Sequence, residues 1–292
     1  MEHQFAEING ITLHYVTEGE GKLVLFLHGF PEFWYAWKDL LTEFGRDHQA
    51  VAPDMRGYNL SSKPADVALY KPKLLVEDVR RLIEHLGHDR CILVAHDWGG
   101  AVGWGLAMAL PQHVAKLIII NSPHPTPFAR ELAHNPEQQR ASAYMNFFRT
   151  VEAETVIAAD DYKWMFRMTH GWGGDSWMND DDLAAYKAAW SQPGALTGGL
   201  NYYRGSPMHP PENDNDRAVL SALAQDRERF RVNVPTLVIW GMRDSALLPC
   251  LLDGLEDFIP DLTIRRIDDA SHWVVHEKPT EVIAAMREFI AR

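Results

Sequence analysis

The sequence is poor in cysteine and has no concentration of basic residues. Only Cys91 and Cys250 occur in 292 residues, and they form neither a CxxC pair nor a disulfide framework, so we expect two free thiols. Acidic residues outnumber basic ones by 40 to 28, which gives a formal net charge of −12, and no Lys/Arg-rich run offsets this charge locally. Because such a chain repels phosphate backbones, we predict no nucleic-acid partner.

Long apolar segments are also missing. No apolar run approaches the roughly 20 residues that a helix needs to cross a bilayer. The first residues, MEHQFAEING, lack the basic and apolar regions of a secretory leader. We therefore expect a cytoplasmic protein with no membrane partner. Hydrophobic residues still make up 46% of the chain, which is enough for a sizeable core. The sequence leaves the oligomeric state open, a homo-oligomer included.

The most informative stretch is residues 91–110, CILVAHDWGGAVGWGLAMAL. Its first half is a continuous apolar run, typical of a buried strand, and its second half carries small and apolar residues at helical spacing. The turn between them holds Ala95, Gly99 and Gly100, whose small size suits a sharp corner. Such a corner leaves the side chain of Asp97 exposed at the top of a sheet.

This strand-turn-helix pattern resembles the nucleophile elbow of the α/β-hydrolases, with Asp97 where esterases and lipases have serine. A carboxylate forms an ester by displacing a leaving group from saturated carbon. Epoxides and alkyl halides are therefore the expected substrates. The alternative is that Asp97 is an ordinary helix N-cap that follows a strand.

A second predicted strand ends in His-Gly-Phe-Pro. The apolar run 22–28 continues directly into Gly29, Phe30 and Pro31. This ending resembles the oxyanion loop of the same superfamily, in which two backbone N–H groups point at one spot. Here they would belong to Phe30 and to Trp98, the residue after the nucleophile. Taken alone, the four residues more often form a plain Gly-Pro turn between a strand and a helix.

The remaining pattern predicts strands that alternate with helices. Asn9-Gly10 lies between two alternating segments and predicts a hairpin. Further strands are expected at 49–53, 114–121, 236–241 and 262–267, and helices at 73–86 and 280–291. From residue 122 to about 230 there are instead helical stretches and Pro-rich loops. We therefore predict an α/β fold, a mostly parallel central sheet with an inserted helical lid, in which the core comprises residues 1–125 and 230–292 and the lid residues 126–229.

The elbow needs a base and an orienting acid, and in this superfamily both follow the nucleophile, acid first. Asp244 comes just after the strand at 236–241, at the carboxyl end where catalytic groups gather in open α/β sheets. His272 follows the last strand and is the expected base, because the pKa of imidazole lies near working pH. Some relatives place the acid after the preceding core strand, but Asn121 and Ser122 stand there and carry no charge.

We expect no cofactor and no metal. His272 and His276 are four residues apart and Glu277 is adjacent, but the segment lacks a helical context and a third ligand at a known spacing. The glycines of GGAVGWG do not form G-x-G-x-x-G, which argues against a nucleotide site. The expected partners are a small-molecule substrate and water.

Five motifs together make the resemblance specific. HGFPEFWYAW, DMRGY, HDWGG, WGMRD and the loop around His272 are similar to those of the epoxide hydrolases of the α/β-hydrolase superfamily, over nearly the whole chain. The resemblance implies two steps. Asp97 attacks an epoxide, and water activated by His272, which Asp244 orients, then hydrolyses the ester to a vicinal diol. The expected substrate is a neutral, largely apolar epoxide.

The same resemblance implies that two lid tyrosines act as proton donors. Residues 200–204, LNYYR, are similar to the asparagine-aromatic-tyrosine-arginine segment of the family, which maps one donor to Tyr203, and the other donor maps to Tyr144. Their phenols would protonate the oxygen of the opening ring. Either tyrosine alone is also compatible with packing of the lid.

An apolar pocket is expected next to the elbow, and Phe30, Trp98, Phe148 and Trp164 are candidates to line it. The alternatives depend partly on the same positions. Haloalkane dehalogenases share the triad but usually have a polar, halide-binding residue where this chain has Phe30. Haloacetate dehalogenases have arginines just after the nucleophile, where this chain has Trp98 and Ala101. A non-catalytic receptor with this fold is expected to have lost a triad member.

Overall fold

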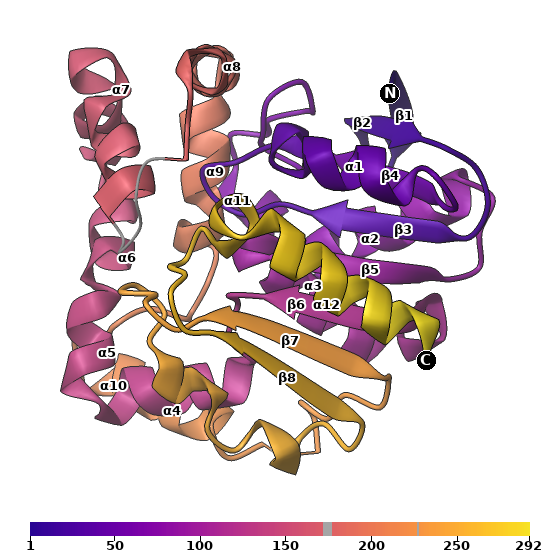
Figure 1. Ribbon diagram of the computed structural model, residues 1–292. Helices are drawn as coiled ribbons and strands as arrows, with labels where there is room; N and C mark the ends of the chain where they lie inside the picture. The colour runs from indigo at the N-terminus through magenta and orange to yellow at the C-terminus, as the bar shows by residue number, and fades with distance from the viewer. Residues whose placement is uncertain (172–176, 227) are drawn as a thin grey trace.

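An eight-stranded, mostly parallel sheet forms the centre of the molecule (Figure 1). The computed structural model describes residues 1–171, 177–226 and 228–292, apart from the side chains of residues 170 and 171. The strands are β1 (Glu2–Ile8), β2 (Ile11–Glu18), β3 (Leu23–Leu27), β4 (Gln49–Pro53), β5 (Cys91–His96), β6 (Val114–Ile120), β7 (Thr236–Gly241) and β8 (Leu262–Ile267). Their order in the sheet is β1-β2-β4-β3-β5-β6-β7-β8, and among these strands β2 alone is antiparallel to its neighbours. The predicted fold class is thus confirmed.

Local sequence explains the strands. All five residues of β3 are buried, and Leu25 belongs to the hydrophobic core on one face of the sheet while Phe26 belongs to the core on the other. Successive side chains of a strand point to opposite faces, so a strand that is buried on both faces is apolar throughout. The turn between β1 and β2 has positive φ at Asn9 (46°) and Gly10 (75°), as a two-residue hairpin requires.

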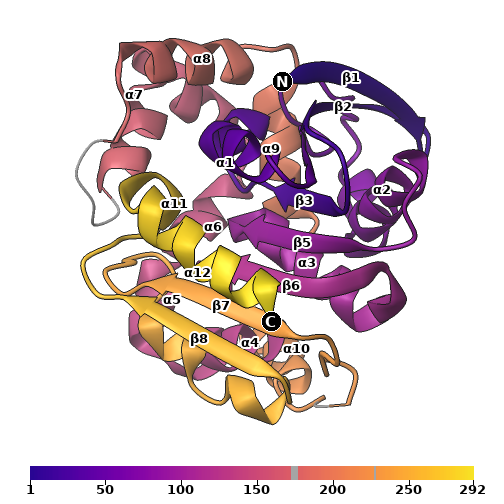
Figure 2. The same cartoon turned by 45° about the vertical axis from the view of Figure 1, so that its right-hand side comes forward.

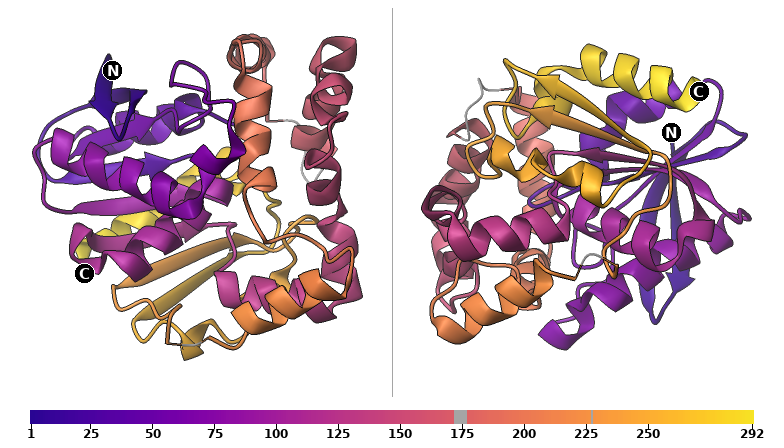
Figure 3. Two further views of the ribbon diagram at one scale, coloured as in Figure 1. Left: turned by 180° about the vertical axis from the view of Figure 1, so that it is seen from behind. Right: turned by 90° about the horizontal axis from the view of Figure 1, so that it is seen from below.

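Helices cover both faces of the sheet. The core on one face contains residues of α1 (Lys38–Phe44) and α12 (Pro279–Ala291), and Figure 2 shows α12 lying along β7. The core on the other face contains residues of α2 (Pro72–His85) and α3 (Asp97–Ala109), which lie in front in the left view of Figure 3. The short α11 (Val274–Glu277) precedes α12.

Between β6 and β7 the described residues form helices and loops rather than strands. The helices are α4 (Pro125–His134), α5 (Pro136–Ala141), α6 (Ala143–Phe148), α7 (Ala153–Gly171), α8 (Asp180–Trp190), α9 (Ala195–Arg204) and α10 (Asp214–Leu223). Helix α7 is kinked, because residues 159–162 have non-helical dihedral angles. Figure 1 shows α5 to α8 on the side of the sheet to which the arrow of β3 points. None of the described helices is long and apolar enough to cross a membrane.

Candidate active site

The turn from β5 into α3 has the geometry of a strained elbow. Asp97 has φ of 48°, a left-handed conformation that non-glycine residues rarely adopt. Gly99 allows the close approach of α3 to β3, because a Cβ atom there would lie 2.3 Å from the carbonyl oxygen of Leu27. A Cβ atom at Gly100 would lie 2.3 Å from the Cβ of Ser122. The two glycines after Asp97 therefore allow α3 to pack closely, which keeps Asp97 at the carboxyl edge of the sheet.

Three residues that are far apart in the sequence meet at this edge. The Nε2 atom of His272 lies 3.7 Å from Oδ2 of Asp97, and its Nδ1 atom lies 2.8 Å from Oδ2 of Asp244. The side chains of His272 and Asp244 are 1% and 0% exposed, whereas that of Asp97 is 11% exposed. The arrangement places an imidazole between an orienting carboxylate and a carboxylate that solvent or a ligand can reach.

Asp244 is held rigidly by donors on two strand ends. Its Oδ1 atom accepts backbone hydrogen bonds from Ala246 (2.9 Å) and Leu247 (2.8 Å). Its Oδ2 atom also accepts a hydrogen bond from Nδ2 of Asn121, at 2.8 Å. Sequence reasoning set Asn121 aside because it carries no charge, and so missed this contact. The contact could have been predicted from the position of Asn121 directly after β6, because β6 pairs in parallel with β7, the strand that precedes Asp244.

Charge controls the proton affinity of His272. Burial lowers its pKa, but the charge of Asp244, the hydrogen bond to Asp244 and the charge of Asp97 outweigh burial and raise the pKa to about 9. The hydrogen bond between Nδ1 and Asp244 also fixes the ring orientation. In the neutral form the proton resides on Nδ1, so Nε2 is the basic atom and faces Asp97.

The two oxygens of the Asp97 carboxylate have different partners. Oδ1 accepts a hydrogen bond from the backbone N–H of Phe30 at 2.8 Å, while Oδ2 is the oxygen nearest to His272. Gly29 permits this approach, since a Cβ atom there would lie 2.3 Å from Oδ1. The backbone N–H of Trp98 belongs to the first turn of α3, where helix donors have no partner within the helix.

Tyr144 on α6 and Tyr203 on α9 lie close together near Asp97. Their ring centroids are 6.2 Å apart; Tyr203 is buried, whereas Tyr144 is partly exposed. Burial first, and then the negative charge of Asp97, raises the pKa of each phenol well above 10. The ring of Trp98 meets that of Tyr203 edge to face, with centroids 5.0 Å apart. Both phenols therefore keep their protons at neutral pH.

The other predicted pocket residues form an aromatic cluster behind the tyrosines. The ring of Phe148 lies 4.8 Å from that of Tyr203 and 5.1 Å from that of Phe30. The ring of Trp164 lies 5.3 Å from that of Phe148. Trp98 lines the cleft that contains Asp97, whereas Phe30, Phe148, Trp164 and the two tyrosines are not among its lining residues.

That cleft has a volume of about 820 Å³ and an apolar lining around its inner end. Its wall includes Ala101, Gly105 and Met108 of α3, together with residues of α2, α4 and the segments that flank α10. The sequence did not identify these three residues as lining a cleft, although Ala101 was considered as a substrate-binding position. Helical periodicity could have predicted two of them as lining residues, because positions 101 and 105 lie one and two turns beyond Asp97 on the same face of α3.

A buried acidic group lies behind His272. Glu32 accepts a hydrogen bond from the hydroxyl of Tyr186 at 2.8 Å, and its carboxylate lies 2.6 Å from Nε2 of His276 and 3.1 Å from Nδ1 of His96. Burial raises the pKa of Glu32, but the two histidines outweigh burial and hold the pKa well below its usual range. Nε2 of His96 lies 3.0 Å from the carbonyl oxygen of His272, which ties the network to the triad.

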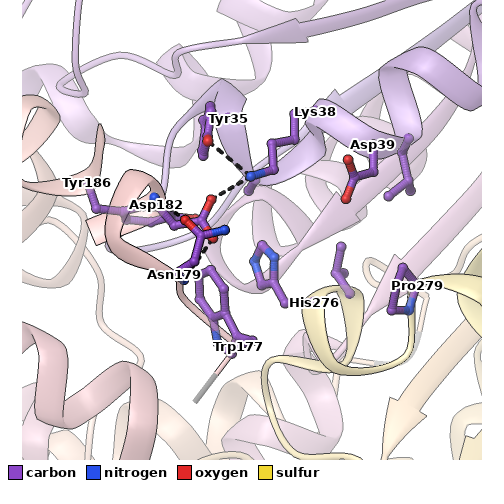
Figure 4. A pocket seen from close by; sticks show the side chains of 12 residues that line it. Tyr35, Lys38, Asp39, Trp177, Asn179, Asp182, Tyr186, His276 and Pro279 are labelled. Carbon is purple, nitrogen blue, oxygen red and sulfur yellow. Dashed lines mark hydrogen bonds and ion pairs between the residues drawn. The ribbon is translucent and has the colours of Figure 1, made fainter. Parts of the chain in front are cut away.

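His276, four residues after His272, forms contacts within the protein. It contacts Glu32 and stacks on Trp177, with ring centroids 3.7 Å apart. In the described part of the chain, no group of three or more His, Cys, Asp or Glu side chains is arranged to hold a metal ion. His276 also lines a second cavity of about 220 Å³, in which Lys38 donates hydrogen bonds to Asp182 and to the hydroxyl of Tyr35 (Figure 4). No triad residue lines this cavity.

Comparison with known proteins agrees with this geometry. A family model described as alpha/beta hydrolase fold matches residues 22–279. The AB hydrolase superfamily protein YfhM of Bacillus subtilis is 36% identical over 98% of this chain and 97% of its own length. Epoxide hydrolase 1 of Caenorhabditis elegans is 37% identical over 99% of this chain and 70% of its own length. A crystal structure of the Bacillus megaterium epoxide hydrolase with an inhibitor has a TM-score of 0.89 and 37% identity, covering 99% of this chain and all of that one. On this similarity, the chain belongs to the α/β-hydrolase superfamily and, within it, to the epoxide hydrolase family.

Proposed function

We propose that this protein hydrolyses a largely apolar epoxide to a vicinal diol through a covalent ester on Asp97. The observation that carries the proposal is a carboxylate at a strained elbow, 3.7 Å from a buried imidazole and close to two protonated phenols. A relative gives independent support, because a mutant of the Bacillus megaterium epoxide hydrolase was crystallised with its product, a naphthyloxy-propane-1,2-diol.

In the first step Oδ2 of Asp97 attacks an epoxide carbon. Oδ1 is engaged with the N–H of Phe30, so Oδ2 is the oxygen with the freer lone pairs. As the new C–O bond forms, the ring C–O bond breaks, and Tyr144 or Tyr203 donates a proton to the ring oxygen. Proton donation by a positioned side chain contributes about 10²–10⁴-fold to a rate. An epoxide needs this acid because an alkoxide is a poor leaving group, whereas a halide leaves without a proton.

In the second step His272 removes a proton from water, and the resulting hydroxide adds to Cγ of Asp97. Esterification has by then removed the negative charge of Asp97, one of the charges that raise the pKa of His272. The imidazole is therefore more easily held neutral during this step. The N–H of Phe30 and that of Trp98 stabilise the oxyanion on Oδ1. The bond between Cγ and Oδ2 then breaks, and Oδ2 leaves in the diol with the second proton of the attacking water, while an oxygen of water stays on Asp97. The proton on His272 returns to the phenol that opened the ring.

The alternative of a dehalogenase has less support from this site. A halide would need side-chain N–H donors beside Asp97; the indole of Trp98 could supply one, but Phe30 offers no second side-chain donor. A haloacetate would need a cation near the nucleophile. Among the described residues that line the cleft, those of α3 up to Gly105 carry no positive charge.

Two measurements test the proposal. His272→Gln should still open the epoxide but trap the ester, giving a covalent adduct on the peptide that contains Asp97, while Asp97→Ala gives none. In a single turnover in water labelled with heavy oxygen, the label should appear in Asp97 and not in the diol. Label that enters the diol directly would show attack by water and overturn the covalent mechanism. Release of halide from haloalkanes or fluoroacetate, without diol from a neutral aryl epoxide, would favour the dehalogenase.

A further inference from the structure

We propose that two copies of this chain associate through the free edges of β1, which pair antiparallel about Phe5 and join the two sheets into one. The inference goes beyond the proposed function and does not depend on it. Three features of β1 carry it: an open edge with unused backbone groups, an exposed aromatic ring at the middle of the strand, and polar side chains that become complementary when the strand meets a second copy of itself.

The edge of β1 lacks the usual protection against pairing. Among the described strands, β1 is outermost at one end of the sheet, with β2 as its neighbour (Figure 2). Its register on β2 is continuous from Glu2 to Ile8, so these residues contain no bulge, and the strand has neither proline nor lysine. Bulges, prolines and lysines are the devices that commonly protect an edge strand. The opposite edge, β8, carries the adjacent exposed residues Arg265 and Arg266, whose like charges disfavour pairing of two copies there.

The backbone groups that point away from the sheet belong to the odd-numbered residues of β1. In an antiparallel ladder, two opposed residues either bond to each other or both point away. Phe5 lies opposite His14, and the carbonyl oxygen of His14 accepts a hydrogen bond on the far side of β2, from the N–H of Asp54 at 2.9 Å. Phe5 therefore directs its own N–H and C=O to the free edge. His3 and Glu7 do the same, because these directions alternate along a strand. In the described part of the chain, no hydrogen bond reaches the outward groups of these three residues.

One register satisfies all of these outward groups. Phe5 is the central residue of β1, so pairing about Phe5 overlaps the two strands completely. Residues 3, 5 and 7 then face residues 7, 5 and 3 of the second copy, and each opposed pair exchanges both of its N–H···O bonds. A shift by one residue would set outward groups against inward ones, and a shift by two would leave part of the edge unpaired. The backbone therefore favours a symmetric dimer centred on Phe5.

The side chains on the outer face of β1 suit this register. Phe5 is 55% exposed, and it would lie opposite the same ring of the second copy, an arrangement that stabilises antiparallel pairs. His3 and Glu7 are also exposed and lie on the same face as Phe5, because side chains alternate between faces. His3 of each copy would lie opposite Glu7 of the other, so this pair of an imidazole and a carboxylate occurs twice. The local attraction offsets part of the repulsion between two chains that each carry a net charge of −12.

Sedimentation velocity over a wide range of protein concentration tests the association. Partial burial and the neighbouring His14 lower the pKa of His3, so the runs are made at pH 6 to keep more of the imidazole protonated, and at low ionic strength because salt screens exposed charges. The native protein should show a reversible equilibrium between monomer and dimer. A protein that stays monomeric at every concentration would overturn the inference.

Charge reversal tests the register. His3→Glu sets two carboxylates against each other and Glu7→Lys sets two cations, and the pair occurs twice, so each variant alone should weaken dimerisation about tenfold. An equal mixture of the two variants should associate nearly as strongly as the native protein, because both pairs of the mixed dimer then unite opposite charges. The matched control, Glu20→Lys, makes the same change of net charge at an exposed residue of the loop after β2 and should leave the dimerisation constant within about twofold. A dimer that the β1 variants leave unchanged, or a mixture that shows no recovery, would refute the proposed interface.

The backbone pairing is tested by hydrogen exchange resolved to single residues. Raising the protein concentration should slow exchange of the Phe5 amide, whereas the Ala6 amide, which faces β2, is an internal control and should not change. Phe5→Pro removes an outward donor and leaves the donors to β2 in place, so it should weaken dimerisation by at least about tenfold while urea unfolding stays cooperative. Exchange at Phe5 that is independent of concentration in a dimeric sample would place the interface elsewhere and overturn the inference.

Discussion

The raised pKa of His272 makes the stability of the fold depend on pH within a defined window. In the unfolded chain the imidazole has a pKa near 6.5, and in the folded protein near 9. The folded state thus binds the proton more tightly, and protonation stabilises it fully below pH 6.5. This contribution is lost as the pH rises through 9. The two pKa values differ by about 2.5, and one pKa unit corresponds to 1.36 kcal/mol. Protonation of His272 therefore contributes roughly 3 kcal/mol to the free energy of unfolding.

Urea unfolding at pH 6 and at pH 9.5 measures this contribution in the native protein and in His272→Gln. Circular dichroism and tryptophan fluorescence should give coincident transitions, which justifies a two-state treatment. Over this interval the unfolding free energy of the native protein should fall by about 3 kcal/mol more than that of the variant. In Asp244→Asn most of the excess should vanish, because Asp244 is the main cause that raises the pKa. The same pH dependence in the native protein and His272→Gln would refute the reasoning.

Three further predictions follow from contacts around Asp97. Asp244→Asn should lower kcat by about 10³–10⁴-fold, because an amide cannot balance the imidazolium; intact-protein mass spectrometry should show accumulated ester, and a normal steady-state rate would contradict the role of Asp244. Tyr203→Phe should slow ring opening by about 10²–10⁴-fold in quenched-flow measurements without slowing ester hydrolysis, and a change in the second step alone would count against proton donation. Gly99→Ala should lower the unfolding free energy by about 1–3 kcal/mol, because the added Cβ meets the carbonyl oxygen of Leu27 at 2.3 Å; unchanged denaturant unfolding would show that the elbow can relax.

The parts of the fold that could be predicted are those with a local pattern. Strands β4, β7 and β8 begin and end at the predicted residues, because each is a short apolar run bounded by polar or turn-forming residues. The hairpin at Asn9-Gly10 follows from two adjacent residues that tolerate positive φ. The approach of Asp97, Asp244 and His272 could also be anticipated, since each follows a strand of one parallel sheet and the ends of such strands share an edge.

The parts that could not be predicted depend on side chains that meet only in the folded chain. Nothing near Glu32 in the sequence indicates His276, 244 residues away, yet their contact explains why both are polar and largely buried. The directions of the aromatic rings in the lid also depend on contacts that form only in the folded chain. Phe148 and Trp164 resemble pocket residues by type, but the packing of α6 and α7 decides which way a ring points, and both rings lie outside the lining of the large cleft.

The amide of Asn121 has a consequence for how such triads vary. It lies 2.8 Å from the carboxylate oxygen of Asp244 that contacts His272, so the residues that follow β6 and β7 meet at this carboxylate, next to the imidazole. The fold therefore has two adjacent positions at which an acid could lie beside the histidine. This chain has the acid, Asp244, at one position and its uncharged isostere, Asn121, at the other. Exchanging the two residues would conserve the charge and the hydrogen-bonding atoms. Two chains of this fold can thus share the same histidine and nucleophile while the third member comes from a different strand.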